Sequence, residues 1–227
     1  MKTVLRIDAS IRRADNEVPD YNSISRGIAS TFMDKWQRLN KGHRVILRDV
    51  GMNPPAHISQ DWIAAVFTPE DKLTEEQRSL VALSDTLIGE LEQADIIVMS
   101  TPMYNYGMPA VLKAWFDQVV RVNKTFSFDL NRGDYPLEPI LSGKKLVLIT
   151  SSGEFGFGPG GIREKWNHLG PHINTLKGYL GVDEVFEINA EYQEFGDSRH
   201  TKSVNDAHAE ANALASRLSH QLEPVDA

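Results

Sequence analysis

The stretch Ala94-Asp95-Ile96-Ile97-Val98-Met99-Ser100 decides the fold of this chain. Its apolar residues follow one another instead of alternating with polar ones, so a strand formed here would be buried on both faces. Such strands occur in parallel sheets that carry helices on both sides. The flanking sequence agrees, because a leucine stripe over residues 80–91 has helical spacing and Pro109 suits the first turn of a following helix.

Strands and helices alternate in the same way along the rest of the chain. Further short β-rich runs predict strands at Val4–Ile7, Arg44–Val50, Leu146–Thr150 and Val185–Ile188. Apolar residues at helical spacing predict helices around residues 24–36, 61–67, 74–91, 109–120, 171–181 and 204–218. Thr74 and Gln77 have the spacing of a capping box. This alternation indicates an α/β protein, and right-handed crossovers favour a doubly wound, three-layer sandwich around a five-stranded parallel sheet.

The composition argues against several classes of protein. The 227 residues include 41% apolar residues and carry a net charge of −7, which fits one globular domain over residues 1–227 and disfavours nucleic acid as a partner. No cysteine is present, so disulfides and cysteine-ligated metals are excluded, and no metal site is expected. No apolar run is long enough for a membrane span. Arg6 and Asp8 interrupt the first apolar run, so no signal peptide is visible and a cytoplasmic location is expected.

A ligand of such a sheet is expected beyond the carboxyl ends of its strands. The loops predicted there are residues 10–22, 101–108 and 151–161. The first loop contains neither a P-loop nor a glycine fingerprint, but it offers the hydroxyls of Ser10, Ser23 and Ser25 next to the start of a helix. Hydroxyls and free amides at a helix N-terminus could hold a phosphate without a lysine. Alternatively, Ser23 serves only as the N-cap of that helix.

The other two loops could bind an aromatic ring system. The second loop places Tyr104 and Tyr106 between two prolines, where a ring would find apolar surface and backbone amides. Packing under the end of the sheet would explain Met103 and Tyr104 equally well. The third loop contains Gly156–Gly161, which matches GxGxxG but lies late in the chain and includes Pro159. We interpret it as a mobile flap rather than a dinucleotide fingerprint.

Taken together, these segments resemble the FMN-dependent NAD(P)H azoreductases and quinone reductases of the flavodoxin-like superfamily, from about Lys2 to about Arg217. The segments that carry the resemblance are Ala9-Ser10, Ser23-Ile24-Ser25, Pro102-Met103-Tyr104-Asn105-Tyr106, residues 109–117, Gly143-Lys144-Lys145 and residues 149–153. The resemblance implies the strand order 2-1-3-4-5. It also implies bound FMN, with NADH or NADPH as electron donor.

The resemblance assigns site residues as well. The residues that it places at the FMN phosphate are Ser10, Ser23, Ile24 and Ser25. Those that it places around the isoalloxazine are Pro102, Met103, Tyr104, Asn105, Tyr106, Ser151, Ser152, Gly153 and Glu154. Phe126 and Phe128 fall where the family has an aromatic residue over the substrate pocket, although ordinary packing of an extended segment would also explain them.

The activity implied by the resemblance is a ping-pong reduction of quinones and azo compounds by a homodimer. The flavin would carry the chemistry, so no catalytic side chain is named. This chain departs from the family where Ser152-Gly153-Glu154 replaces the usual Arg-Gly-Gly and Tyr106 replaces phenylalanine, and its loop over residues 11–22 is longer. A non-catalytic flavodoxin-like electron carrier and a redox-sensing flavin-binding protein remain as alternatives.

Overall fold

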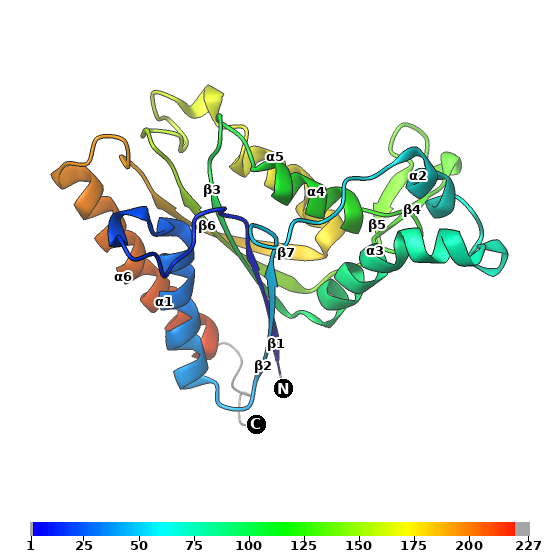
Figure 1. The fold of residues 1–227 in the computed structure, drawn as a ribbon, viewed down its shortest axis with the longest axis horizontal. Coiled ribbons are helices and arrows are strands. Elements are labelled where there is room, and N and C mark those ends of the chain that lie inside the picture. Colours follow the sequence, from blue (N-terminus) through cyan, green and yellow to red (C-terminus); the bar gives the residue numbers. More distant parts are fainter. Residues whose placement is uncertain (1, 221–227) are drawn as a thin grey trace.

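The computed structural model describes residues 2–220, and five of the strands form one parallel sheet in the order β2-β1-β3-β6-β7 (Figure 1). The strands are β1 (Thr3–Asp8), β2 (Arg44–Asp49), β3 (Ile96–Pro102), β4 (Phe126–Phe128), β5 (Leu137–Pro139), β6 (Lys144–Ser151) and β7 (Val182–Ala190). The α-helices are α1 (Ile24–Leu39), α2 (Gln60–Val66), α3 (Glu75–Gln93), α4 (Ala110–Val119), α5 (Gly170–Leu176) and α6 (Ser198–His220). Short 3-10 turns are η1 (Pro19–Tyr21), η2 (Glu70–Lys72), η3 (Leu130–Arg132), η4 (Glu164–Trp166) and η5 (Lys177–Leu180). The predicted fold and the strand order 2-1-3-4-5 are therefore confirmed.

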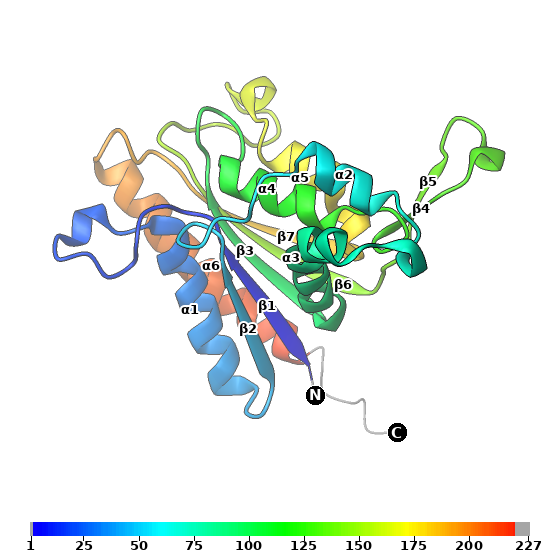
Figure 2. The same cartoon turned by 45° about the vertical axis from the view of Figure 1, so that its right-hand side comes forward.

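Helices cover both faces of the sheet (Figures 1 and 2). Helices α1 and α6 pack on one face, and α3, α4 and α5 pack on the other. Side chains of β3 alternate between the two cores: Ile96 and Val98 join the α1–α6 core, and Ile97 and Met99 join the α3–α4–α5 core. The uninterrupted apolar run thus follows from burial on both faces.

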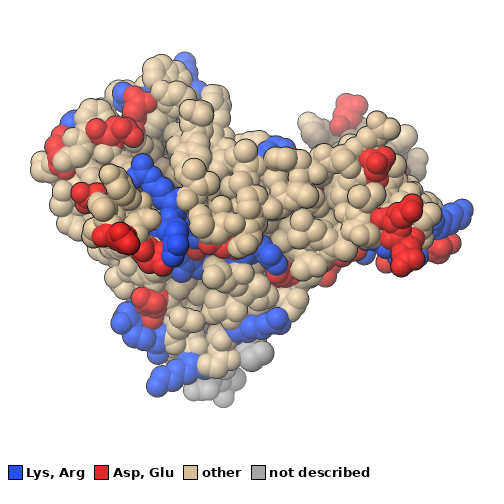
Figure 3. Space-filling view, viewed as in Figure 1, with Lys and Arg blue, Asp and Glu red and all other residues tan. Residues whose placement is uncertain are grey.

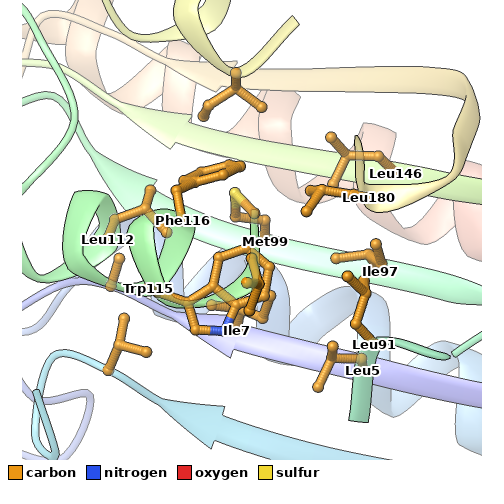
Figure 4. Packing of buried hydrophobic residues seen from close by; sticks show 14 of the residues in the cluster. Leu5, Ile7, Leu91, Ile97, Met99, Leu112, Trp115, Phe116, Leu146 and Leu180 are labelled. Carbon is orange, nitrogen blue, oxygen red and sulfur yellow. The ribbon is translucent and has the colours of Figure 1, made fainter. Parts of the chain in front are cut away.

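Large aromatic side chains fill each core. Trp115 and Phe116 of α4 are both buried and meet edge to face with ring centroids 5.1 Å apart. Figure 4 shows them next to the apolar side chains of β1 and β3. On the opposite face, Phe32 and Trp36 of α1 stack with centroids 6.3 Å apart. Each aromatic residue lies on the helix stripe that the sequence predicts.

Local sequence signals also set the helix ends. Thr74 and Gln77 form the predicted capping box at the start of α3, and each satisfies a backbone amide of the other. Gly181 adopts a left-handed conformation with φ of 77° and closes the segment that follows α5.

The structure differs from the sequence prediction at strand boundaries. The antiparallel pair β4–β5 was not predicted, because each strand has only three residues and shows no measurable period. This pair extends away from the main sheet (Figure 2). At the edge of the sheet, β7 is longer than predicted, since its charged and polar residues obscured its ends. Strand β1 covers Thr3–Asp8 and is one residue longer at each end than the predicted Val4–Ile7.

The surface shows mixed charge. On the face seen in Figure 3, basic and acidic side chains are interspersed over most of the surface, and one short band of basic side chains runs left of the centre. Among residues 2–220, no helix is both long enough and apolar enough to cross a bilayer.

Candidate functional site

The candidate site lies at the carboxyl edge of the sheet, around the switch point, where the connections that follow neighbouring strands lead to opposite faces. Strand β1 pairs with β2 on one side and with β3 on the other, and Asp8 lies opposite Ser100 at the carboxyl ends of β1 and β3. The chain leaves β1 toward α1 on one face and leaves β3 toward α4 on the other face. Loops that diverge in this way open a crevice between them, which is the usual ligand position in doubly wound folds.

The loop after β1 brings three serines to the start of α1. Ser10, Ser23 and Ser25 are 2%, 5% and 0% exposed, although the loop that joins them is itself exposed. The Ser23 hydroxyl accepts a hydrogen bond from the Arg26 amide at 3.3 Å, so Ser23 is the N-cap of α1. Its oxygen also lies 3.4 Å from the Ser25 hydroxyl oxygen.

Donors remain available at this helix end. Within residues 2–220, the amides of Ile24 and Ser25 have no hydrogen-bond acceptor. Two free amides beside buried hydroxyls form a donor-rich concavity at the positive end of a long helix. This chemistry fits an anion such as a phosphate.

The loop after β3 is a tight turn with strained backbone. Tyr104 and Gly107 exchange two backbone hydrogen bonds of 3.0 Å each. The central residues Asn105 and Tyr106 have φ values of 48° and 65°, the pattern of a type I′ turn. A bulky residue in this region costs of order 1–3 kcal/mol, which other contacts must offset.

Contacts of the Tyr106 side chain provide this compensation. Its ring packs against Trp166 and Phe157 at centroid distances of 5.9 Å and 6.2 Å. Its hydroxyl donates to Glu154 Oε2 at 2.9 Å, and this hydrogen bond raises the pKa of the phenol. The other Glu154 oxygen pairs with Arg163 Nη2 at 2.8 Å. Glu154, one of the departures from the family pattern, thus joins the second loop to the third.

The loop after β6 is held by the segment that follows β7. The amides of Gln193 and Glu194 donate to the carbonyls of Ser152 and Gly153 at 3.2 Å and 3.0 Å. A Cβ on Gly153 would lie 2.6 Å from Glu194 Cγ, so this close approach requires glycine unless Glu194 moves. The loop is therefore fixed by backbone pairing and does not need the missing arginine.

The second and third loops meet around a pocket of about 240 Å³. Its lining residues are Met103, Asn105, Tyr106, Ser152, Gly153, Glu154, Phe157 and Glu194. Six of these are among the residues that the sequence assigns to the isoalloxazine. An adjoining pocket of about 210 Å³ shares Met103, Ser152 and Phe157 and extends toward the start of α5. Together they offer apolar and sulfur surface, backbone amides and carboxylates.

Other predicted residues lie elsewhere. Pro102 and Ser151 face each other at the ends of β3 and β6, one residue before the pocket, and the Met103 amide donates to the Ser151 carbonyl at 2.8 Å. Tyr104 is half-buried and does not line the pocket. The structure places Phe126 and Phe128 on β4, away from the pocket of their own chain (Figures 1 and 2).

The sequence did not predict Phe157 and Glu194, which line the pocket, or Arg163, which pairs with Glu154. Glu194 follows β7, whose loop was not considered, although all carboxyl ends of parallel strands share one edge. Phe157 lies inside the glycine-rich segment that we interpreted as a flap. Only 6% of it is exposed, and its carbonyl accepts from Asn167 at 3.2 Å.

The donor set fits FMN and not a metal ion. Amides and hydroxyls at one strand end suit a phosphate, and the neighbouring pocket suits a flat ring with polar edges. Within residues 2–220, no group of three or more His, Asp or Glu side chains could hold a metal ion.

Comparisons with known proteins identify the family of the chain. Residues 2–215 match a protein family described as having a flavodoxin-like fold. The chain is 65% identical to the FMN-dependent NADH:quinone oxidoreductase 2 of Colwellia psychrerythraea over 218 residues, which cover 96% of this chain and 100% of that one. It is 60% identical to the enzyme of the same name from Idiomarina loihiensis, over 96% of this chain and 91% of that one.

A solved structure shows the same fold. An FMN-dependent NADH-azoreductase from Bacillus anthracis, in complex with FMN, has a TM-score of 0.82 at 18% identity and covers 96% of this chain and 100% of its own. At this identity, the likeness concerns the fold alone.

Proposed function

The chain belongs to the flavodoxin-like family of FMN-dependent NADH:quinone oxidoreductases, and from that premise we propose that it reduces quinones and azo compounds with NADH or NADPH through bound FMN. A quinone takes up two electrons and two protons and leaves as the hydroquinone, while the donor leaves as NAD(P)⁺. An azo bond needs two such cycles for cleavage into two amines. When bound, FMN would supply the two-electron hydride chemistry that links the donor to the acceptor.

One observation carries this proposal. The loops after β3 and β6 converge on one pocket at the carboxyl edge of the sheet, and the N-terminus of α1, with two free amides and buried hydroxyls, follows β1 at that same edge. A ligand with a flat polar-edged ring and a phosphate tail uses both features at once. FMN has this shape.

We assign the phosphate end to Ser10, Ser23, Ile24 and Ser25. Hydroxyl groups and amides would hold the phosphate here, and the positive end of the α1 dipole would favour its charge. Arg26, in the first turn of α1, already pairs with Asp49 at 2.6 Å and is buried. The phosphate would therefore be bound without a direct ion pair.

We assign the ring end to the turn after β3 and the loop after β6. Met103, Asn105 and Tyr106 would line one side of the isoalloxazine, and residues 151–154 would lie along its edge, with Pro102 and Tyr104 supporting the turn. Ser152 and Gly153 can contribute backbone groups where the family has an arginine. Glu154 would orient Tyr106 rather than touch the ring, since both its oxygens are engaged.

Donor and acceptor would use the same pocket in turn. The two adjoining pockets share one floor at Met103 and Phe157, so a nicotinamide and a quinone would occupy the same space over the ring. Asn167 and Asn189 supply amide groups in the inner part of this space, where they could bind a carbonyl oxygen. No side chain is assigned as an acid or base.

We also propose that the chain acts as a homodimer. The β4–β5 arm carries exposed apolar side chains far from the pocket of its own chain, including Phe128 at 53% and Tyr135 at 86% exposure. A second copy would cover this arm, and Phe126 and Phe128 would then line the partner's acceptor pocket.

We place the reaction in the cytoplasm, where NADH is available, and treat residues 1–227 as one FMN-binding domain.

The purified protein tests the proposal directly. Its absorbance spectrum should show bound flavin, and denaturation should release FMN that chromatography separates from FAD. NADH should reduce the flavin, and so bleach its absorbance, at least as fast as the enzyme turns over. A benzoquinone should then reoxidise the flavin and restore its colour. Recovery of FAD alone would contradict the cofactor assignment, and a flavin that NADH leaves oxidised would favour an electron carrier.

A further inference from the structure

A buried cluster of charged side chains lies under the loop that follows β1. It joins Arg26 of α1 with Asp8 at the end of β1 and Asp49 at the end of β2. Asp8 in turn accepts from Arg6 Nε at 3.0 Å and from the hydroxyl of Ser100 on β3 at 2.7 Å. The cluster thus connects the strand ends on both sides of the switch point.

Arg26 makes the contacts that matter most for the loop. Its side chain is 6% exposed, and its Nη2 and Nε donate to the carbonyl oxygen of Ser10 at 2.6 Å and 3.2 Å. The same guanidinium holds both oxygens of Asp49, at 2.6 Å and 2.7 Å. Burial alone would lower the pKa of Arg26, but the bonds and charges of Asp49 and Asp8 raise it, so Arg26 stays charged.

The Ser10 carbonyl is also enclosed from a second direction. A Cβ on Gly51 would lie 2.1 Å from the Ser10 carbonyl oxygen and 2.8 Å from Arg26 Nη2. Atoms cannot approach this closely, so only glycine fits at this position. Arg26 and Gly51 therefore fix the carbonyl between them.

The direction of this carbonyl sets the direction of the next amide. In a trans peptide, the carbonyl of Ser10 and the N–H of Ile11 point to opposite sides. Since Arg26 holds the oxygen inward, the Ile11 amide must point outward, and within residues 2–220 this amide has no acceptor. The Ser10 hydroxyl oxygen accepts from the Arg12 amide at 3.1 Å, so its own proton remains free to donate.

We propose that Arg26 is a positioning residue: by holding the Ser10 carbonyl against Gly51, it aims the Ile11 amide and the Ser10 hydroxyl at the phosphate of FMN and so makes the protein prefer FMN to riboflavin. The inference rests on the proposed function and deepens its phosphate end. Two arginines and two aspartates make up the cluster, namely Arg6, Arg26, Asp8 and Asp49, so its net charge is zero. The cluster therefore contributes by fixing the geometry of the loop rather than by attracting the phosphate.

The test compares FMN with riboflavin, which lacks only the phosphate. The apoprotein is titrated with each flavin while flavin fluorescence is followed, and thermal unfolding is measured on the same samples. In Arg26→Met and in Gly51→Ala, the preference for FMN should fall about tenfold or more, as for loss of a charge-assisted hydrogen bond. Riboflavin affinity should stay close to that of the wild type. Arg26→Lys, which keeps one donor, should restore part of the preference.

Arg48→Met is the matched control. Arg48 lies on β2 and pairs with Glu90, so this variant loses a cation and an ion pair without touching Ser10, and its flavin preference should equal that of the wild type. Equal losses of FMN and riboflavin affinity in Arg26→Met, or an unchanged preference in a folded Gly51→Ala, would overturn the inference. If Arg26→Met does not fold, Gly51→Ala decides. A wild-type protein that binds no FMN would refute the proposed function as well as the inference.

Discussion

Replacing Ser25 by alanine should weaken cofactor binding while leaving the fold almost as stable as before. The Ser25 side chain is fully buried, and within residues 2–220 its hydroxyl has one polar partner, the Ser23 hydroxyl oxygen at 3.4 Å. A contact of that length is at the limit of a hydrogen bond, so its loss should cost well under about 1 kcal/mol of unfolding free energy. Towards FMN, the same hydroxyl would donate to a charged phosphate oxygen. Such bonds contribute about 1.5–3 kcal/mol, which corresponds to roughly a 10- to 150-fold change in Kd.

Ser23→Ala is the contrasting variant. Ser23 caps α1, so this change should lower the free energy of unfolding by about 1 kcal/mol even without flavin. Ser25→Glu should abolish FMN binding, because a carboxylate would meet the phosphate at close range without a counter-charge. The assays are fluorescence titration of the apoprotein with FMN and urea unfolding in the same buffer. Wild-type affinity in Ser25→Ala would show that the phosphate lies elsewhere, and Ser25 would then be only a core residue.

Further predictions address kinetics, pH and packing. Initial rates over a grid of NADH and benzoquinone concentrations should give parallel double-reciprocal lines, because both substrates would use one pocket in turn; intersecting lines would refute the shared pocket. Burial lowers the pKa of His208, so the folded state favours the neutral ring, and the free energy of unfolding should fall as the pH drops below the ordinary pKa of 6.5. His208→Gln should reduce this loss, as measured by urea unfolding at pH values on either side of 6.5, and an identical pH dependence in both proteins would contradict the explanation. Phe32→Ala, which empties a fully buried position in the α1–α6 core, should lower the free energy of unfolding by about 3–5 kcal/mol, and a loss under about 1 kcal/mol would mean that this core is loosely packed.

The sequence predicted those parts of the fold in which burial leaves a pattern. Residues 96–99 are apolar in succession because β3 is covered on both faces, and the stripe of α3 is regular because one side of that helix faces the sheet. The β4–β5 arm has no such pattern, since it is short and largely exposed. Its pairing depends on how the chain returns after Arg132 and Gly133, which local sequence does not determine.

The sequence predicted the location of the candidate site but not the side-chain contacts within it. The loops after β3 and β6 could be located because ligand sites in parallel sheets gather at one edge. The pairing of Glu154 with Tyr106 and Arg163 could not, since it depends on the conformations of two loops that are far apart in the sequence. Arg26 was missed for a different reason: in the sequence it is one polar residue in an amphipathic helix, and only the fold brings it to the Ser10 carbonyl.

The division of the interior into two cores has a consequence for how such a protein can diversify. The backbone of the sheet separates the packing around α1 and α6 from the packing around α3, α4 and α5. The serine loop leads into α1, on the first of these faces, whereas the turn that carries Tyr106 leads into α4, on the second. Substitutions behind one of these segments therefore leave the packing behind the other undisturbed. On the proposed assignment, a lineage with this architecture can alter the ring side of its site one residue at a time while the phosphate side is inherited unchanged.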